Sequence, residues 1–355
     1  NEALMMSSLQ TKLWMVTLRK RYREILSDIG KQVSTESGLN EHVLIIDGLN
    51  NFIRTWAVSP ATNADGQHIG GIVGFLQTVG LAVRTIMPTR VIIAFDGKGG
   101  SARRKKIFPE YKAGRKPLKR PNRVEGLTDE SEAENMRRQF RRLIEYLDCL
   151  PVTVITMENI EADDTIAYIS KQVLKNSRVT IMSTDKDFYQ IVNDRIAVWS
   201  PTKKVLYDRK RLEEEFEILA ENFVYYRIID GDKSDNISGV RGLGLKTIRK
   251  KFPFLVDKQI VNIDEFLNVT QLLEHKEILL RNYRLMQLHN VDIPGNAKLS
   301  IVDQVRDGSS RLVKYKIHKM FLEDTIDHAI RNPDVWLQTS FNQLELVLNN
   351  ASNKR

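Results

Sequence analysis

The apolar run Val43-Leu44-Ile45-Ile46, followed at once by Asp47-Gly48, is the stretch of sequence that decides the fold. A continuous run of aliphatic residues stopped by such a pair is typical of a strand that is buried on both faces, as in a parallel sheet. The same pattern returns at residues 91–97, where Asp96 and Gly97 follow the apolar run. Two such strands predict a sheet with acids at its carboxyl edge.

Further strands and helices alternate with these two strands along the chain. We expect strands at 152–156, at 179–187, which again ends in acids, and at 196–200; we expect helices at 70–85 and 130–147. This alternation predicts an α/β domain built on a mainly parallel sheet. Beyond residue 207 the pattern becomes helical, with one apolar stripe from residue 212 to residue 230.

Composition limits the class of protein. The chain has 355 residues, 42% of them hydrophobic, which is enough for one large domain or two ordinary ones. The single Cys149 excludes a disulfide framework and a cysteine-based zinc site. No apolar run approaches a membrane span and no secretory signal is recognisable, so we expect a cytoplasmic protein without a membrane partner. A net charge of +9 suggests a polyanionic partner.

Acidic residues recur in five clusters. Any single cluster could be an ordinary helix cap or turn. Ligands of open parallel sheets bind beyond the carboxyl ends of the strands, however, so we expect most of these acids to meet there. Nine carboxylates at close range require cations, and oxygen donors without His or Cys favour two Mg²⁺ or Mn²⁺ ions, as in phosphodiester cleavage. The acids are Asp47; Asp96; Glu161, Asp163 and Asp164; Asp185 and Asp187; and Asp232 and Asp235.

A basic segment lies between the second and third acidic clusters. Residues 103–123 contain ten Lys or Arg and one acid, Glu110, and so carry a charge equal to the +9 of the whole chain. Charge runs are usually solvated linkers. Here aromatic and proline residues are interspersed, and Tyr111 could stack on a base, so we favour a segment that binds nucleic acid.

A glycine-rich turn, Gly239-Val240-Arg241-Gly242-Leu243-Gly244, precedes a basic helix that contains Lys246, Thr247 and Lys250. A plain helix–helix turn is the simpler interpretation. Glycines nevertheless let backbone N–H groups approach a phosphate, and the lysines that follow favour contact with a DNA backbone.

Taken together, these motifs resemble the flap endonuclease (5′-3′ exonuclease) family of 5′-nucleases, in particular its phage branch. Any one motif alone would be a weak signal, but they occur in family order between residues 43 and 252. The matching segments are 45–48, 95–96, 109–112, 161–164, 183–187, 231–236 and 239–247.

The resemblance implies a domain organisation. It implies a PIN-like, Rossmann-like nuclease core at 43–207 with a helical arch at about 98–145, and a helix-three-turn-helix DNA-binding region at 208–300. The rest of the chain would be a helical N-terminal extension at 1–42 and a C-terminal helical tail at 301–355.

The resemblance also implies roles for individual residues. Asp47, Asp96, Glu161 and Asp163 would hold the first metal ion; Asp185, Asp187, Asp232 and Asp235 would hold the second, with Asp164 near both. Lys112 and Arg104 would contact the scissile phosphate, so that these two residues, Asp163 and Asp185 are the expected catalytic residues. By the same resemblance, the glycine turn would also bind K⁺ through backbone carbonyls. The expected DNA-binding residues are Arg103, Tyr111, Arg115, Gly239, Gly242, Gly244, Lys246, Thr247 and Lys250.

We therefore expect a monomeric, Mg²⁺-dependent 5′-nuclease of DNA replication and repair, in the host cytoplasm if it is phage-encoded. Its substrates would be branched or nicked duplex DNA with a 5′ single strand, and RNA–DNA hybrids. Candidate partners are a single-strand-binding protein and a sliding clamp, which residues 338–346 could dock. Two alternatives stay open. A PIN-type ribonuclease would not need the glycine turn, and a non-catalytic DNA-binding module would not need nine clustered carboxylates.

Overall fold

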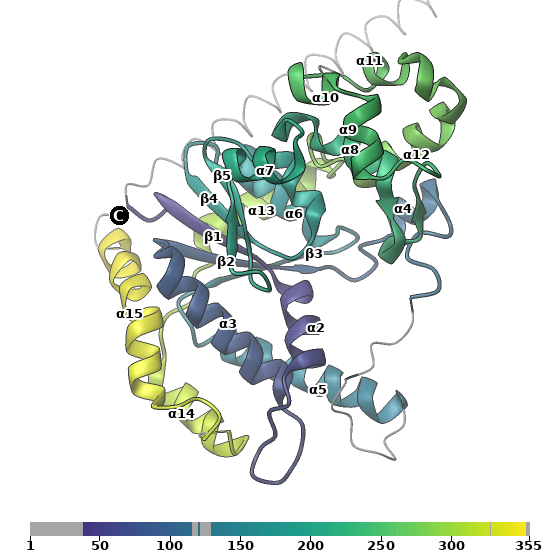
Figure 1. Ribbon diagram of the computed structural model, residues 1–355. Coiled ribbons are helices and arrows are strands. Elements are labelled where there is room, and N and C mark those ends of the chain that lie inside the picture. Colours follow the sequence, from purple (N-terminus) through teal and green to yellow (C-terminus); the bar gives the residue numbers. More distant parts are fainter. Residues whose placement is uncertain (1–37, 116–119, 121–128, 261, 327, 353–355) are drawn as a thin grey trace, which may run out of the picture.

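The fold is described from a computed structural model, which covers residues 38–115, 120, 129–260, 262–326 and 328–352 (Figure 1). Residues 1–37 of the helical extension expected at 1–42, and the middle of the expected arch at 116–119 and 121–128, lie outside the described residues.

A six-stranded sheet forms the centre of the molecule, in the order β3-β2-β1-β4-β5-β6. Five strands are parallel, and the last is antiparallel to β5 at one edge. In the central strand, Ile45 lies opposite both Ile92 and Ile181. The strands are β1 (His42–Asp47), β2 (Arg90–Asp96), β3 (Thr153–Met157), β4 (Arg178–Met182), β5 (Ile196–Ser200) and β6 (Val205–Tyr207).

Both faces of the sheet are buried, which explains the continuous apolar runs. Side chains of β1 alternate between two hydrophobic clusters: Val43 and Ile45 belong to one, and Leu44 and Ile46 to the other. The second cluster is covered by helices that Figure 1 shows beside the sheet: α2 (Gly48–Val58), α3 (Gly70–Ile86), α5 (Asp129–Leu147), α14 (Lys314–Glu323) and α15 (Pro333–Ser352).

The opposite face is covered by α6 (Ala162–Tyr168), which continues as a π-helix over Ile169–Val173, and by α13 (Gly295–Asp307). A smaller lobe, residues 209–286, extends from this face (Figure 1). The lobe contains α7 (Arg209–Phe216), α8 (Phe223–Asp230), α9 (Leu245–Lys251), α10 (Phe254–Asp257), α11 (Ile263–Leu267) and α12 (Lys276–Met286). A short helix at the base of the basic segment, α4 (Ala102–Ile107), lies beside α12.

The other expected strands and the helices at 70–85 and 130–147 are confirmed, but the strand expected at 179–187 ends at Met182, and a 3₁₀ helix begins at Lys186. The expectation of one helical stripe from 212 to 230 is wrong. Helix α7 ends at Phe216, where the capping residue Glu217 has a left-handed φ of 51°, and α8 begins at Phe223. The rings of Phe216 and Phe223 lie 5.0 Å apart. Seven residues of one straight helix would separate them by about 10 Å along the axis, so this contact requires the break.

The C-terminal helices lie against the sheet domain. Gly80 of α3 lets α15 approach, because a Cβ atom there would lie 2.6 Å from Nε1 of Trp336. Residues 338–346, the expected clamp-docking segment, fall within α15; of their apolar residues, Phe341 and Leu344 are buried in the core, whereas Leu346 is exposed. Phe341 and Leu344 are therefore not accessible to a partner, and clamp docking by this segment stays a prediction. Among the described residues, no helix combines the length and apolarity that crossing a membrane requires.

Candidate active site

Four acids from four different elements meet at the carboxyl edge of the sheet. Asp47 ends β1, Asp96 ends β2, Asp163 lies in the first turn of α6, and Asp185 follows β4. All four line a cavity of about 950 Å³. Since β1 and β4 are the strands at which the strand order reverses, the cavity opens where doubly wound sheets bind their ligands. We call these four residues the cavity acids.

Backbone and hydroxyl donors position Asp47 and Asp185. Asp47 caps α2 by accepting from the backbone N–H of Asn50 (3.2 Å), and it accepts from the Ser183 hydroxyl (2.9 Å). Asp185 caps the 3₁₀ helix Lys186–Ile191 by accepting from the N–H of Asp187 (2.8 Å). Burial raises the pKa of Asp47 to about 6, and burial together with Asp187 raises the pKa of Asp185 to about 8.

The other two cavity acids are attached to the start of α6. Asp96 accepts from the N–H of Ala162 at 2.7 Å, which ties the end of β2 to this helix. Burial raises the pKa of Asp163 well above its ordinary value, although Arg104, 3.9 Å away, opposes the increase. Neighbouring cavity acids add smaller increases: Asp96 acts on Asp47, Asp47 on Asp185, and Asp185 on Asp163. Additional positive charge in the cavity would therefore stabilise the ionised form of these carboxylates.

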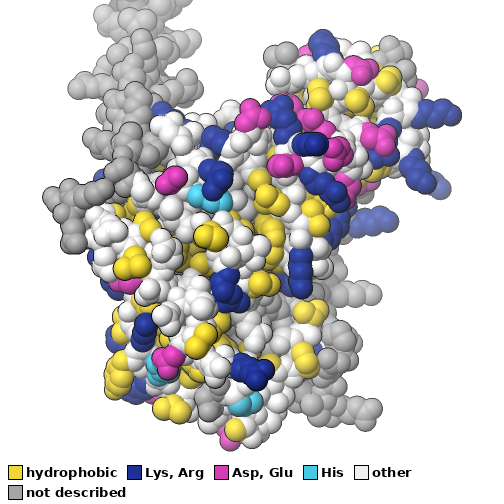
Figure 2. All heavy atoms as spheres, turned by 60° about the vertical axis from the view of Figure 1, so that its left-hand side comes forward, with side chains coloured by type: hydrophobic (Ala, Val, Ile, Leu, Met, Phe, Trp, Pro, Cys, Tyr) yellow, Lys and Arg dark blue, Asp and Glu magenta, His cyan; other side chains and the backbone are white. Residues whose placement is uncertain are grey.

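The remaining five acids are paired with cations, and we call them the paired acids: Glu161, Asp164, Asp187, Asp232 and Asp235. Figure 2 shows Asp and Glu side chains interspersed with Lys and Arg where the smaller lobe joins the body. The structure thus brings all nine predicted acids to one region but divides them into two groups.

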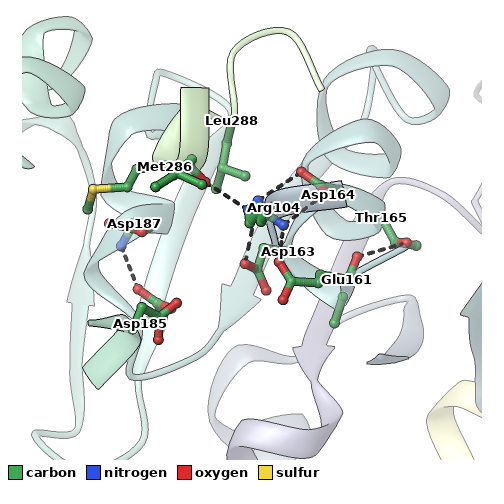
Figure 3. A network of polar contacts seen from close by, with 12 residues as sticks. Arg104, Glu161, Asp163, Asp164, Thr165, Asp185, Asp187, Met286 and Leu288 are labelled. Carbon is green, nitrogen blue, oxygen red and sulfur yellow. Dashed lines mark hydrogen bonds and ion pairs between the residues drawn. The ribbon is translucent and has the colours of Figure 1, made fainter. Parts of the chain in front are cut away.

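Arg104 binds two of the paired acids, Glu161 and Asp164 (Figure 3). Its Nη1 and Nη2 donate to the two carboxylate oxygens of Asp164 at 3.0 and 3.1 Å, Nη1 also contacts Glu161, and Nε donates to the Leu285 carbonyl. The residue is 2% exposed and is absent from the cavity lining. The guanidinium of Arg104 is occupied by Glu161 and Asp164, so the expected phosphate contact stays a prediction. Its neighbour Arg103 also binds Asp164, at 2.8 Å.

Lys112 does reach the cavity. Its Nζ donates to Oε1 of Glu161 at 2.5 Å, and its backbone N–H donates to the Asp235 carbonyl at 2.9 Å. Burial lowers the pKa of Lys112, but nearby Asp163 and Glu161 outweigh burial and hold the pKa above its ordinary value. Arg115 also lines the cavity and pairs with Asp235.

Base stacking by Tyr111 is not supported. Its ring is 2% exposed, and its hydroxyl donates to Glu161 at 3.2 Å. Burial opposes ionisation of this phenol and raises its pKa far above the ordinary range. Tyr111, Arg104 and Lys112 therefore fix Glu161, whose pKa lies below its ordinary value because Arg104 and Lys112 outweigh burial.

The glycine turn lies outside the cavity lining. Gly239 has no space for a side chain, since a Cβ atom would lie 2.2 Å from the Asp230 carbonyl oxygen. Gly242 has a left-handed φ of 83°, whereas Gly244, the N-cap of α9, has open space where a Cβ atom would lie. Lys246 and Lys250 of α9 are exposed and Thr247 is half-buried, so a basic surface follows the turn.

Three further residues of the site were not predicted. Ser183 and Asn50 position Asp47, and Asn50 also accepts from the Thr184 hydroxyl at 2.9 Å. Both lie within three residues of a predicted acid, and this proximity in sequence could have identified them. Arg227 binds Asp187 and Asp232; the sequence indicates it only as a lone charge in the apolar run Phe-Val-Tyr-Tyr-Arg-Ile-Ile of α8.

The donor set fits a hard divalent cation, because every cavity acid offers carboxylate oxygens and the described residues that line the cavity include no His or Cys. As the described side chains stand, no three His, Cys, Asp or Glu residues are close enough to enclose a metal ion. Arg104 lies between Glu161 and Asp164, and Arg227 lies between Asp187 and Asp232. These arginines explain part of the distance between the carboxylates.

Comparisons with known proteins agree with this geometry. Residues 42–217 match the family model for the 5′-3′ exonuclease N-terminal resolvase-like domain. The chain is 27% identical over 278 residues to a 5′-3′ exonuclease of Buchnera aphidicola, covering 73% of this chain and 90% of that protein. It is 32% identical over 210 residues to a thermostable DNA polymerase I of Thermus thermophilus, covering 59% of this chain. The match covers 23% of the polymerase, so the chain spans about a quarter of that relative's length.

A solved structure shares the fold. It is that of bacteriophage T5 D15 flap endonuclease in a pseudo-enzyme-product complex with DNA and metal ions. The TM-score is 0.55 at 23% sequence identity, covering 81% of this chain and 99% of that chain.

Proposed function

Since the chain belongs to the 5′-3′ exonuclease family, we propose that it is a structure-specific 5′-nuclease that hydrolyses phosphodiester bonds of DNA with divalent metal ions. One observation carries the proposal. The four cavity acids converge on one cavity with raised pKa values at Asp47, Asp163 and Asp185, beside the cationic side chains of Lys112 and Arg115. Acids that resist ionisation in this way are matched to bound cations.

The cavity acids would hold two Mg²⁺ or Mn²⁺ ions. Such ions supply a hydroxide nucleophile at neutral pH and stabilise the charge that develops on the cleaved phosphate. Ser183 and Asn50 keep Asp47 in its rotamer, and the N–H of Ala162 does the same for Asp96. These bonds fix donor oxygens in advance, which lowers the cost of ordering the site.

Lys112 would orient the scissile phosphate. Its ammonium lies at the cavity wall, where it can exchange the Glu161 carboxylate for a phosphate oxygen. Arg115, half exposed, would contact the same strand from the rim. Arg104 would act indirectly, by holding Glu161 and Asp164 in place.

The proposed substrates are duplex DNA that carries a 5′ single strand at a junction, and RNA–DNA hybrids. One wall of the cavity is apolar, with Leu49, Ile53 and Trp56 from α2 and Met136 from α5, and it suits an unpaired base. The glycine turn and α9 would form a helix-three-turn-helix that binds the duplex backbone, with K⁺ bound by the turn. The names of the Buchnera and T5 relatives, an exonuclease and a flap endonuclease, support this substrate class.

Cleavage of end-labelled substrates tests the proposal. The enzyme is compared on 5′-flap DNA, 3′-flap DNA and single-stranded RNA in Mg²⁺, with EDTA and Ca²⁺ as controls. We expect 5′-flap products cut near the junction in Mg²⁺ alone. A preference for single-stranded RNA would favour a PIN-type ribonuclease. Binding of flap DNA without cleavage under every divalent metal would leave a DNA-binding module.

A further inference from the structure

Arg227 is a buried cation inside the acidic site. It is the one charged residue in the run Phe-Val-Tyr-Tyr-Arg-Ile-Ile of α8, and its side chain is 5% exposed. Nε lies 2.6 Å from Oδ1 of Asp187, and Nη2 lies 2.7 Å from Oδ2 of Asp232. Nη1 donates to the Gly231 carbonyl at 3.1 Å. Every guanidinium nitrogen therefore has an acceptor, and the side chain joins two segments of the site.

The family resemblance places four acids around a second ion, and these acids differ in their ion pairs. They are Asp185, Asp187, Asp232 and Asp235. Arg227 neutralises Asp187 and Asp232 from inside the fold. Asp235 pairs with Arg115, whose side chain is half exposed and also donates to the Ser234 carbonyl. Among the described residues, Asp185 has hydrogen bonds but no ion pair, and it alone of the four lines the cavity.

We propose that Arg227 is a built-in cation that replaces part of the second divalent ion's charge at Asp187 and Asp232. Arg227 thereby weakens binding of that ion and leaves Asp185 as its main direct carboxylate. Its guanidinium holds the 185–187 turn and the 231–235 turn together before any ion arrives, since a buried arginine is stable only with such partners. This inference rests on the two-ion site of the proposed function.

Electrostatics gives the direction of the effect. A positive charge beside two carboxylates repels a divalent cation and cancels part of their attraction for it. Without Arg227, Asp187 and Asp232 would repel each other, and a bound divalent ion would relieve that repulsion. Loss of Arg227 should therefore tighten metal binding while it weakens the metal-free fold. A purely structural arginine would produce only the second change.

The test measures Mn²⁺ binding to the full chain without DNA, by electron paramagnetic resonance of free Mn²⁺ and by the Mn²⁺-induced increase in Tm. In Arg227→Gln we expect the second Mn²⁺ to bind at least about ten-fold more tightly than in the wild type. We also expect a larger increase in Tm. Arg142→Gln is the matched control, because Arg142 bridges Glu145, Glu323 and Asp324 on the opposite face of the sheet. This control should lose stability without a change in Mn²⁺ affinity.

Equal or weaker affinity for the second Mn²⁺ in a folded Arg227→Gln would overturn the proposal. If that variant does not fold, Arg227→Met decides, because it also removes the positive charge and its apolar side chain suits the apolar run of α8, so the second ion should again bind more tightly. Wild-type or weaker affinity in Arg227→Met would then overturn it. If neither the wild type nor a variant bound Mn²⁺, the two-ion site itself would be contradicted, and this inference with it.

Discussion

The Nζ of Lys112 lies 2.5 Å from Oε1 of Glu161, so a cation of the cavity wall is held by one of the paired acids. We expect Lys112→Met to lower kcat on 5′-flap DNA by about 100-fold or more, because a positive charge at the reacting phosphate is lost. DNA affinity should change little. Single-turnover cleavage and DNA binding in Ca²⁺ measure the two effects. Lys319→Met, which removes an exposed lysine of α14, is the control. An unchanged kcat would exclude Lys112 from phosphate positioning.

Arg104 gives a prediction on stability. It is almost fully buried and binds Asp164 through two nitrogens. Arg104→Gln leaves buried carboxylates without their partner, and we expect the free energy of unfolding to fall by about 3–5 kcal/mol. Urea denaturation in EDTA measures it. A loss of kcat without a loss of stability would instead favour the phosphate contact expected from the sequence.

Stability should depend on pH in the opposite sense to that of ordinary acids. The pKa of Asp47 is raised to about 6 and that of Asp185 to about 8. The folded protein then binds more protons than the unfolded chain, so the metal-free protein loses stability as pH rises from about 4 to about 8. We expect a fall of the order of 5 kcal/mol between pH 5 and pH 8 in EDTA.

Divalent ions should remove this dependence, because they bind the ionised carboxylates. Urea denaturation with and without Mg²⁺ at both pH values provides the measurement, and the double variant Asp47→Asn, Asp185→Asn is the control. Glu161 and Asp232, whose pKa values are lowered, act in the acid range, where their contribution is lost as pH falls below about 4. Equal stability at pH 5 and pH 8 in EDTA would argue against the raised pKa values.

The exposed lysines of α9 give a prediction on salt dependence. Lys246→Ala and Lys250→Ala should each weaken duplex binding and reduce the slope of log Kd against log salt by about one, if each lysine contacts one phosphate. The kcat at saturating DNA should stay unchanged. Binding titrations at several KCl concentrations measure the slope, and Lys314→Ala on α14 is the control. Unaltered slopes would place the duplex elsewhere.

Local signals in the sequence were sufficient to predict the sheet and the cavity acids. The run that ends at Asp47 predicts a strand buried on both faces, and a parallel sheet brings its end next to Asp96 and Asp185. No distant contact is needed for these predictions, because the carboxyl ends of parallel strands share one edge.

The roles of the cations could not be predicted in the same way. Arg104 and Tyr111 lie in a basic run that suggests exposure, yet packing against α6 and α12 buries them. The break between Phe216 and Phe223 likewise depends on an aromatic contact across the turn. Net charge and the spacing of apolar residues are properties of the local sequence. The partner of a long side chain depends instead on tertiary packing.

The most direct test of the nuclease assignment is Mg²⁺-dependent cleavage of a 5′-flap DNA by Asp185→Asn beside the wild type. The substitution keeps the shape of a cavity acid and removes its charge, and Asp194→Asn, at a highly exposed acid, is the matched control. The predicted result is a loss of cleavage of about 1,000-fold or more, with flap affinity in Ca²⁺ unchanged. Turnover near the wild-type rate would contradict the assignment of the cavity acids as the metal-binding centre of a nuclease.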